Sequence, residues 1–489
     1  MSTPEPSNAI LLFRDDLRLS DHQALTAAVQ AGHRLTCAFI HDPHAPYPPG
    51  GARRWWLHHA LDVLAKHLAG HGGQLVVRHG AAADVLADLR AETGAQHVFW
   101  SRRYTPDEVA ADTALKAALT SQGCTVHSHA GRYLLEPWHV TTKAGTPFKV
   151  FTPFWRASRE HIRATGLGDA LPVPKSITFA DTIATAPLEE FDLLPTSPNW
   201  AEGFEPLWQP GEEGALARLD AFLEEGAHGY AKGRDFPAEP HTSRLSPYLQ
   251  SGNISPRQIW AALDRAEHLG QMSGRDADKF RAELGWRDFA AYLLFHNRDF
   301  EDIEFQPRFR SFPWRYDTNH LTRWQRGQTG YPIVDAGMRE LWQTGYMHNR
   351  VRMVVASFLV KHLRIDWRAG RDWFWDTLVD GDLASNAASW QWVAGCGADA
   401  APYFRVFNPM MQAAKFDPDG KFIRQFVPEI ADLPDKYLAA PWTAPLDVLS
   451  KAGIKLGETY PCPMVDHADA RRAALTAFDE LSANETGAD

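Results

Sequence analysis

Short apolar runs alternate with helical patterns in the N-terminal part of the chain. Five runs are predicted to be β-strands, at residues 9–13, 35–40, 75–78, 97–100 and 125–128. Between them, segments such as 81–92 and 106–121 combine helical spacing with strong helix formers. Strands that alternate with helices form parallel sheets covered on both faces. The pattern therefore predicts an N-terminal α/β domain with a Rossmann-like parallel sheet, which we place at residues 1–135.

Strand patterns nearly vanish in the rest of the chain. Residues 171–214 are rich in proline and acidic side chains, which indicates a long interdomain linker that we place at 136–214. Beyond it, helical periods dominate, for example over 215–225, 256–268 and 346–363. We therefore expect an all-α C-terminal domain at 215–480, followed by a disordered tail of small and polar residues at 481–489.

Composition excludes several classes of protein. No apolar run is long enough to span a membrane, and the polar start MSTPEPSNAI lacks a signal pattern, so we expect a cytoplasmic protein that does not enter membranes. The four cysteines are scattered without a CxxC pair, which argues against a zinc site or a disulfide framework. The residues after the first strand, Arg14-Asp15-Asp16-Leu17, are no glycine-rich dinucleotide fingerprint, which disfavours a dehydrogenase of the NAD type.

The charge distribution leaves two interpretations open. A net charge of -10 argues against a general nucleic-acid binder. Residues 281–371, however, are rich in arginine and aromatic side chains, so that this segment could form a local DNA-facing surface. The alternative is that the arginines pair with nearby acids such as Asp299, Glu301 and Asp302. The chain also has 18 tryptophans, an excess that suggests a stacking or redox role for a few of them.

Three short segments concentrate polar chemistry. Thr242, Ser243 and Ser246 precede a predicted helix, where such residues either cap the helix or bind an anion such as phosphate. The segments 345–353 and 380–392 crowd acids, arginines, an amide and two indoles into an apolar helical region. Because buried charges need partners, Arg352 is expected to pair with Asp380 or Asp382. 

Trp390 and Trp392 are two positions apart, about 200° around a helix, so a single core face does not explain both.

With these segments the chain resembles the photolyase/cryptochrome family, and specifically bacterial cyclobutane pyrimidine dimer (CPD) photolyases. The resemblance runs from Ile10 through Glu429, close to the whole chain. Its most specific stretches are Ile10–Leu19, Thr242–Ser246, Trp286–Phe289, Gly330–Asp335, Met347–Met353, Asp380–Trp392 and Ala400–Pro409. Several long motifs in the right order are far more specific than any one of them.

The resemblance implies that the helical domain binds FAD, which is active as FADH−. The implied contacts near the phosphates and ribose are Tyr230, Thr242, Ser243, Arg244, Leu245 and Ser246. Those near the ribose and isoalloxazine are Asp380, Gly381 and Asp382, with Arg352 paired to Asp382. Asn386 matches the asparagine at flavin N5, where an amide oxygen accepts from a protonated N5 and so favours the reduced cofactor.

The resemblance also implies a pocket for a cyclobutane dimer that is flipped out of UV-damaged DNA. The matching residues are Glu283, Trp286, Arg287, Asn349, Arg350, Met353 and Trp392, with Arg234 at the rim. Trp286 and Trp392 would form an apolar wedge around the fused pyrimidines, and Glu283 would hydrogen-bond their carbonyl edge. Glu283, Asn386 and Trp392 are thus the expected catalytic residues, and no metal is expected.

Trp390, Trp367 and Trp314 match the family's electron-transfer chain from flavin to surface. The expected function is light-dependent repair of CPDs by electron transfer from excited FADH− to the dimer, carried out by a monomeric deoxyribodipyrimidine photo-lyase. The alternatives are a cryptochrome-type blue-light photoreceptor and a (6-4) photolyase, and the latter subfamily has histidines at the positions of Asn349 and Met353.

A second, light-harvesting chromophore is common in the family. Tyr104–Glu108 resembles the region that contacts methenyltetrahydrofolate, with Glu108 as the acid that holds the pterin. Asp107 stands where folate binders commonly have asparagine. A deazaflavin is the alternative, and Glu108 could instead serve only in the first turn of a helix.

Overall fold

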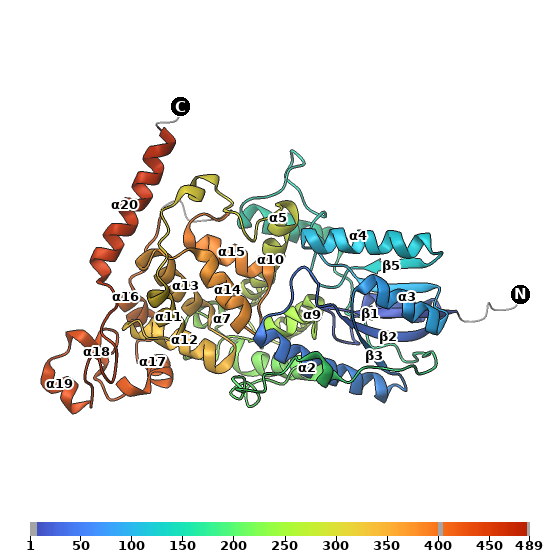
Figure 1. Cartoon of the computed structure of the whole chain (residues 1–489), viewed down its shortest axis with the longest axis horizontal. Coiled ribbons are helices and arrows are strands. Elements are labelled where there is room, and N and C mark those ends of the chain that lie inside the picture. Colours follow the sequence, from blue (N-terminus) through green and yellow to red (C-terminus); the bar gives the residue numbers. More distant parts are fainter. Residues whose placement is uncertain (1–6, 400–403, 487–489) are drawn as a thin grey trace, which may run out of the picture. The chain divides into compact units, whose positions relative to one another are not determined.

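A computed structural model describes residues 7–399 and 404–486 (Figure 1). Among these residues, contacts define two compact units. One combines the chain up to His228 with Ser243–Arg298, and the other combines Gly229–Thr242 with the chain from Asp299 onward. The limits of functional domains, expected at residues 135, 214 and 480, remain a prediction. The first four residues of the Ala400–Pro409 motif lie outside the described residues.

The first unit contains a five-stranded sheet with the order β3-β2-β1-β4-β5, and every pairing is parallel. Its strands are β1 (Asn8–Phe13), β2 (Arg34–His41), β3 (Leu75–His79), β4 (His97–Ser101) and β5 (Thr125–His129). Each lies at a run that the hydrophobic pattern predicted. This strand order, reversing at β1, is that of a doubly wound α/β fold. The prediction of a Rossmann-like parallel sheet is confirmed.

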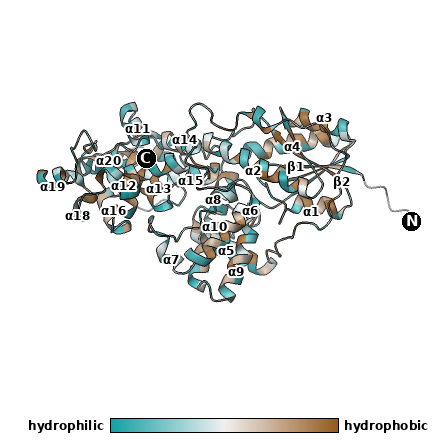
Figure 2. Cartoon of the chain, turned by 90° about the horizontal axis from the view of Figure 1, so that it is seen from below, coloured by the Kyte–Doolittle hydropathy of each residue, from teal (hydrophilic) through white to brown (hydrophobic). Residues whose placement is uncertain are grey.

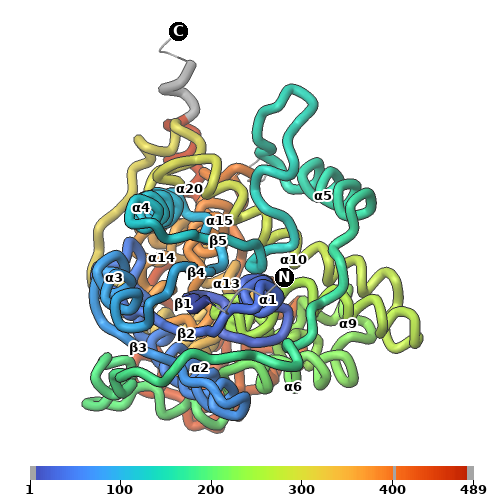
Figure 3. The backbone as a smooth tube through the Cα atoms, turned by 90° about the vertical axis from the view of Figure 1, so that its right-hand side faces the viewer, coloured from blue at the N-terminus to red at the C-terminus, as the bar shows by residue number. Residues whose placement is uncertain are grey.

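Successive side chains along each strand point to opposite faces of the sheet, so the core has two parts, one on each face. Ile10, Leu12, Val98 and Trp100 face α3 (Ala82–Thr93) and α4 (Pro106–Ser121) in one buried cluster. Helix α1 (Gln23–Gln30) lies on the opposite side of the strands (Figure 3). The central strands β1, β2 and β4 are buried almost throughout and are nearly continuous hydrophobic runs, whereas β5 at the edge is more polar and only partly buried.

The first unit has further helices, joined by long irregular segments. They are α2 (Gly51–Gly70), α5 (Phe151–Thr165), the 3-10 turn η1 (Leu188–Phe191), α6 (Glu212–Ala221), the π-helical turn η2 (Phe222–Gly226), α8 (Ser246–Gln250), α9 (Pro256–His268) and α10 (Gly274–His296). Helix α9 shows why these segments fold locally: Ser255 and Gln258 form a reciprocal capping box, and Pro256 occupies the first turn. Its residues are both hydrophilic and hydrophobic (Figure 2), as an amphipathic helix requires.

Part of the predicted linker belongs structurally to the sheet. Phe179 pairs with Leu35 as an isolated parallel bridge. The Val77 N–H donates to the Thr185 hydroxyl at 2.8 Å, and the Ala186 N–H donates to the Val77 carbonyl at 3.1 Å. A chain segment that satisfies an edge strand in this way protects the edge from pairing with other molecules.

Charged residues occupy the carboxyl end of β1, where a dinucleotide-binding fold has glycines. The buried Arg18 guanidinium donates to the carbonyl of Gly252 at 2.8 Å. Asp21 is fully buried and forms an ion pair with Arg257. The Asp16 carboxylate lies 3.0 Å from Nε2 of His22. These side chains join the sheet to the segment that begins α9, so their role is structural.

In its described part the second unit contains helices and no β-strand beyond isolated bridges, which confirms the all-α prediction. Its elements are α7 (Tyr230–Gly233), η3 (Pro307–Ser311), α11 (Thr318–Gln325), α12 (Pro332–Thr344), α13 (Asn349–Ser357), the π-helical turn η4 (Phe358–His362), α14 (Trp367–Thr377), α15 (Leu383–Ala394), α16 (Pro409–Phe416), α17 (Lys421–Phe426), η5 (Pro428–Ile430), α18 (Asp435–Leu438), η6 (Pro441–Thr443), α19 (Leu446–Lys451) and α20 (His467–Thr486). Helix α20 extends into the segment 481–489 that was expected to be disordered. Trp324, Trp367 and Trp390 are fully buried in one large core.

Two absences bear on function. In the parts of the chain that the structure describes, no helix is long and apolar enough to cross a lipid bilayer. Over the same ranges, no group of three or more His, Cys, Asp and Glu side chains is arranged to hold a metal ion.

Candidate functional site

The second unit brings together the ends of α13, α14 and α15, which carry several predicted site residues. Arg352 on α13 forms an ion pair with Asp380 at 2.8 Å and also donates to the Met347 carbonyl at 2.7 Å. Burial opposes the charged form of Arg352, but the adjacent Asp380 outweighs it and raises the Arg352 pKa above its ordinary value. Asp380 is therefore the partner that the structure records, and it was one of the two that the sequence allowed.

Asp382 has a local role at the start of α15. Its carboxylate accepts from the Ser385 N–H at 2.8 Å, so it caps the helix. Gly381 precedes it, and Asp380 and Asp382 are both buried. The resemblance implied an ion pair between Arg352 and Asp382. The ion pair that the structure records for Arg352 is instead with Asp380.

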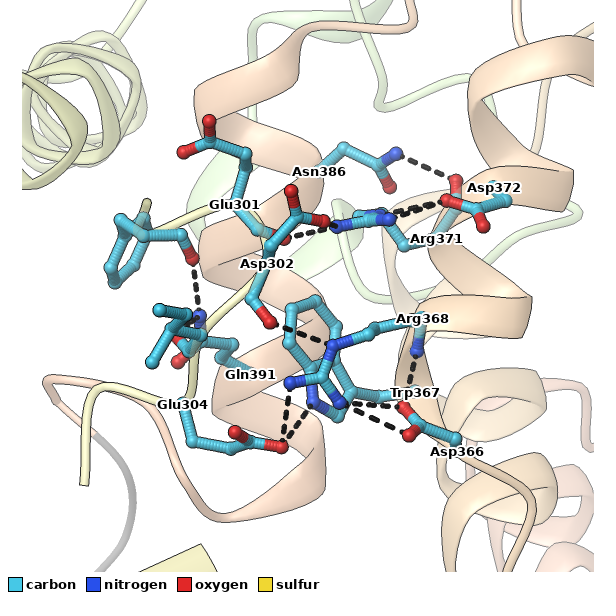
Figure 4. Close-up of polar contacts among 12 residues, drawn as sticks. Glu301, Asp302, Glu304, Asp366, Trp367, Arg368, Arg371, Asp372, Asn386 and Gln391 are labelled. Atoms are coloured by element: carbon cyan, nitrogen blue, oxygen red, sulfur yellow. Dashed lines mark hydrogen bonds and ion pairs between the residues drawn. The ribbon is translucent and has the colours of Figure 1, made fainter. Parts of the chain in front are cut away.

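Asn386 is held in one orientation by its neighbour helix. Its amide nitrogen donates to the backbone carbonyl of Arg371 on α14 at 2.9 Å, as Figure 4 shows. The Asn386 side chain is buried, and no described residue donates a hydrogen bond to its Oδ1. An oriented acceptor of this kind suits a bound group with an N–H donor. The residues present thus fit the N5 edge of a reduced flavin.

The other predicted cofactor contacts lie on both units. In the second unit, Tyr230 is buried at the start of α7, and Thr242 ends the same segment. In the first unit, Ser243, Arg244 and Leu245 form the turn that leads into Ser246 of α8. Arg244 adopts a left-handed backbone conformation, with φ of 51°. The Ser243 carbonyl accepts from Arg218 at 2.9 Å, which fixes this turn against α6.

Three predicted substrate residues share α10 in the first unit. Glu283 forms an ion pair with Lys279 one turn earlier, at 3.0 Å, and is partly exposed. Trp286 is 36% exposed, and its indole stacks on Phe151 with ring centres 3.7 Å apart. Trp286 is thus an accessible aromatic platform with a rigid backing. Arg287 instead points into the unit, where it donates to the carbonyls of Arg132 and Leu249.

The remaining predicted substrate residues lie in the second unit. Asn349 is exposed in the first turn of α13. Arg350 pairs with Asp235 at 2.8 Å and lies 4.4 Å over the Phe416 ring, while Met353 accepts a weak hydrogen bond from it. Arg234 lies 5.5 Å over the ring of Tyr230. Trp392 is half-buried near the end of α15.

The three predicted redox tryptophans occupy neighbouring parts of the second unit. Trp390 is buried edge-on against Phe374, with ring centres 5.1 Å apart. It also packs so closely on Gly370 of α14 that an added Cβ there would lie 2.1 Å from the indole. Trp367 begins the same α14. Trp314 precedes Arg315, which pairs with Ile365 just before α14. Electron transfer along these indoles stays a prediction.

Glu108 has a local function in α4. Its carboxylate accepts from the Thr105 hydroxyl at 2.9 Å, and Arg103 lies 3.6 Å away. Thr105 in turn accepts from the Glu108 N–H. These contacts are those of a helix start, and the antenna role of Glu108 stays a prediction.

Gln391, which no sequence pattern singled out, stands between Trp390 and Trp392 in the chain and is fully buried. Its side chain donates to the carbonyls of Phe300 and Ile303 and accepts from the Phe305 N–H, at 2.6, 3.0 and 2.8 Å. One amide thereby satisfies three backbone groups of the 300–305 loop. A polar residue inside an apolar helical turn was the available signal for this contact.

Asp288, also missed, lies next to the predicted substrate residues of α10. Its carboxylate is buried and accepts from the Leu135 N–H at 3.1 Å. Burial is the main cause that raises the Asp288 pKa from 3.8 to about 7.

We expect this carboxyl to make stability depend on pH. Between about pH 4 and 7 the folded protein binds a proton at Asp288 that the unfolded chain does not, so stability is lost as the pH rises through this range. The free energy of unfolding should fall by about 2 kcal/mol from pH 5 to 7 because of this one group. Urea titrations of the wild type and Asp288→Asn at both pH values measure it. The variant should lose that part of the slope, while Asp264→Asn, at an exposed ion pair, should keep it. Equal slopes in the wild type and Asp288→Asn would contradict the assignment.

Two protein-family models match this chain. The model of the FAD binding domain of DNA photolyase matches residues 280–480, and the DNA photolyase model matches residues 9–175. A deoxyribodipyrimidine photo-lyase of Agrobacterium fabrum is 50% identical over 471 residues, which cover 96% of this chain and 97% of the relative. The crystal structure of a class III photolyase from Agrobacterium tumefaciens superposes with a TM-score of 0.95 at 49% identity, covering 98% of this chain and 99% of that chain. Cryptochrome-1 of Arabidopsis thaliana is 36% identical over 97% of this chain and 71% of the relative.

The chain therefore belongs to the photolyase/cryptochrome family.

Proposed function

We propose that this protein repairs cyclobutane pyrimidine dimers in DNA with light, as a deoxyribodipyrimidine photo-lyase. The observation that carries the proposal is the buried Asn386 amide, whose nitrogen is held by Arg371 and whose oxygen is left as an acceptor. It lies within the match to the FAD binding domain, as does the Arg352–Asp380 ion pair. A preorganised polar group beside a cofactor's ring tunes the chemistry of that cofactor.

The residues that would hold FAD fall into two groups by chemistry. Tyr230 and the Thr242–Ser246 segment offer hydroxyls and backbone N–H groups to the phosphates and ribose. Arg352, Asp380, Asp382 and Asn386 would hold the isoalloxazine end. When bound and reduced, the flavin supplies the light-driven electron that opens the dimer. The Asn386 side-chain oxygen would accept a hydrogen bond from the N5–H group and so keep the proton on N5.

The DNA side of the site uses aromatic and polar groups. Trp286, backed by Phe151, would stack on one face of the flipped dimer, and Trp392 would complete the wedge. Glu283 would give up its ion pair with Lys279 and form a hydrogen bond with the carbonyl edge of a pyrimidine. Asn349, Arg350 and Met353 would line the pocket, Arg234 would contact its rim, and Arg287 would support it through Arg132 and Leu249. Positioning and electrostatics are the contributions of the protein.

A repair assay tests the proposal directly. Purified protein, reduced beforehand with dithionite, is mixed with UV-irradiated oligothymidine and illuminated with blue light. We expect dimers to disappear in the light and to persist in the dark. An oligonucleotide with one (6-4) photoproduct is the matched substrate, and it should remain unchanged because Asn349 and Met353 replace the histidines of that subfamily. Dimers that persist under illumination would overturn the proposal and favour the cryptochrome alternative.

The finer assignments belong to the same proposal. We propose a cytoplasmic monomer with methenyltetrahydrofolate as antenna, or a deazaflavin in its place, near Glu108. Absorption of the chromophores released from purified protein distinguishes the two, because a folate and a deazaflavin absorb at different wavelengths.

A further inference from the structure

Trp367, the middle residue of the predicted electron-transfer chain, has a charged partner that the family resemblance did not supply. Its indole is completely buried, and its Nε1 donates to Oε1 of Glu304 at 3.4 Å (Figure 4). Glu304 is itself buried, with 5% of the residue exposed. A buried carboxylate thus accepts a hydrogen bond from the one polar atom of a buried indole.

Two guanidinium groups share this environment, and each has a further partner. Arg368 lies 4.7 Å from the centre of the Trp367 ring and pairs with Glu304 at 2.9 Å and with Asp366 at 3.0 Å. Arg371 lies 5.5 Å from the ring centre and pairs with Asp302 and Asp372. These four carboxylates outnumber the two guanidinium groups. Since Asp302 and Asp372 are mostly exposed and screened by water, the buried charge of Glu304 has more influence on the indole than either of these acids.

The position of Glu304 is fixed by the helix that carries Trp390. Gln391 on α15 holds the loop through Phe300, Ile303 and Phe305, and Glu304 lies between the last two. Arg368 also donates to the Asp302 carbonyl at 2.7 Å. The carboxylate is therefore in place before any charge develops, which is the condition for electrostatic stabilisation without reorganisation.

We propose that Glu304 stabilises the positive charge on Trp367 during photoreduction. After Trp390 has given one electron to the light-excited flavin, it takes one electron from Trp367, which becomes an indole radical cation. Trp367 then takes one electron from Trp314. No bond breaks in these steps, and the indole keeps its proton. Loss of an electron makes the N–H a stronger donor, so its hydrogen bond to a carboxylate becomes charge-assisted and stronger in the low dielectric of the core.

The inference rests on the proposed function, because it needs a bound flavin and the tryptophan chain. Its test uses the flavin-loaded full chain with Glu304→Gln, which keeps the shape and an oxygen for the indole but removes the charge. Asp366→Asn is the matched control, since it removes another carboxylate from Arg368 without touching the indole. The quantum yield of photoreduction is measured under blue light with an external thiol reductant.

We expect Glu304→Gln to lower this yield roughly tenfold, in keeping with the loss of one nearby buried charge, and Asp366→Asn to change it less than about twofold. Repair by chemically reduced enzyme should match the wild type in both variants, which a merely structural role of Glu304 would not allow. An equal yield in Glu304→Gln and wild type would overturn the inference.

A second measurement addresses Trp367 more directly. In a Trp314→Phe background the positive charge stops at Trp367, and its lifetime can be followed by transient absorption. Adding Glu304→Gln should shorten that lifetime several-fold, because the charge returns faster from a less stabilised site. An unchanged lifetime would overturn the inference. Absence of any photoreduction in the wild type would instead indicate that the proposed function itself is wrong.

Discussion

Replacing Trp390 by phenylalanine should reduce light-driven reduction of the flavin to background. Trp390 is buried with 2% exposure and contacts Phe374 and Gly370, so its indole is held rigidly in the core of the second unit. A phenyl ring fits the same space but is much harder to oxidise than an indole, so the first electron has no donor. Photoreduction under blue light, followed by the loss of oxidised flavin absorbance, measures the effect.

Repair should survive this change when the flavin is reduced chemically, because the dimer receives its electron from the flavin and not from Trp390. Trp324→Phe is the matched control: this buried indole lies 6.2 Å from Trp390 and donates to the Val355 carbonyl, yet it is not part of the predicted chain. It should lose stability to a similar extent and keep photoreduction. Normal photoreduction in Trp390→Phe would refute the assigned electron path.

The second large effect is expected from Arg352→Met. This change leaves the Asp380 carboxylate buried without the guanidinium that it now contacts at 2.8 Å. Removing one partner of a buried ion pair costs about 3 kcal/mol or more, because the remaining charge stays desolvated. The free energy of unfolding, from urea titration, should fall by that amount, and flavin should be lost during purification.

Two further variants separate this cost from a general effect of losing a cation. Lys421→Met removes an exposed ion pair to Glu239, and it should cost less than about 1 kcal/mol. The double variant Arg352→Met with Asp380→Leu should recover most of the stability but not the flavin, since an apolar pair replaces the buried charges. If Arg352→Met were as stable as the wild type, the ion pair would not contribute to the stability of the fold.

The architecture was predictable from the sequence because its signals are local. Strands β1 to β4 are mostly apolar runs between helical segments, and the buried strands of a parallel sheet require such runs. The boundaries of α4 and α9 follow from Thr105 and Ser255, whose side chains cap the helices. Arg352 and Asp380 were predictable as partners because charges in an apolar region must be paired.

The contacts that were missed join residues far apart in the chain. Glu304 and Trp367 are 63 residues apart, and Gln391 holds a loop 86 to 91 residues before it. The hydrophobic periodicity of the sequence cannot predict contacts between residues so far apart. Asp288 was missed for another reason: its neighbours Trp286 and Arg287 have clear functional matches, whereas only the fold shows that its carboxyl is buried against Leu135.

The ion pair of Asp21 with Arg257 has a consequence for synthesis of the protein on the ribosome. Asp21 and Arg257 are 236 positions apart in the chain. Arg18 likewise donates to the carbonyl of Gly252, which is translated much later than Arg18. The strands are complete once residue 129 has been made. The nascent sheet therefore lacks the Arg257 partner of Asp21 and the Gly252 partner of Arg18 until more than a hundred further residues have been translated. The first unit reaches its full stability only when translation is past the middle of the chain.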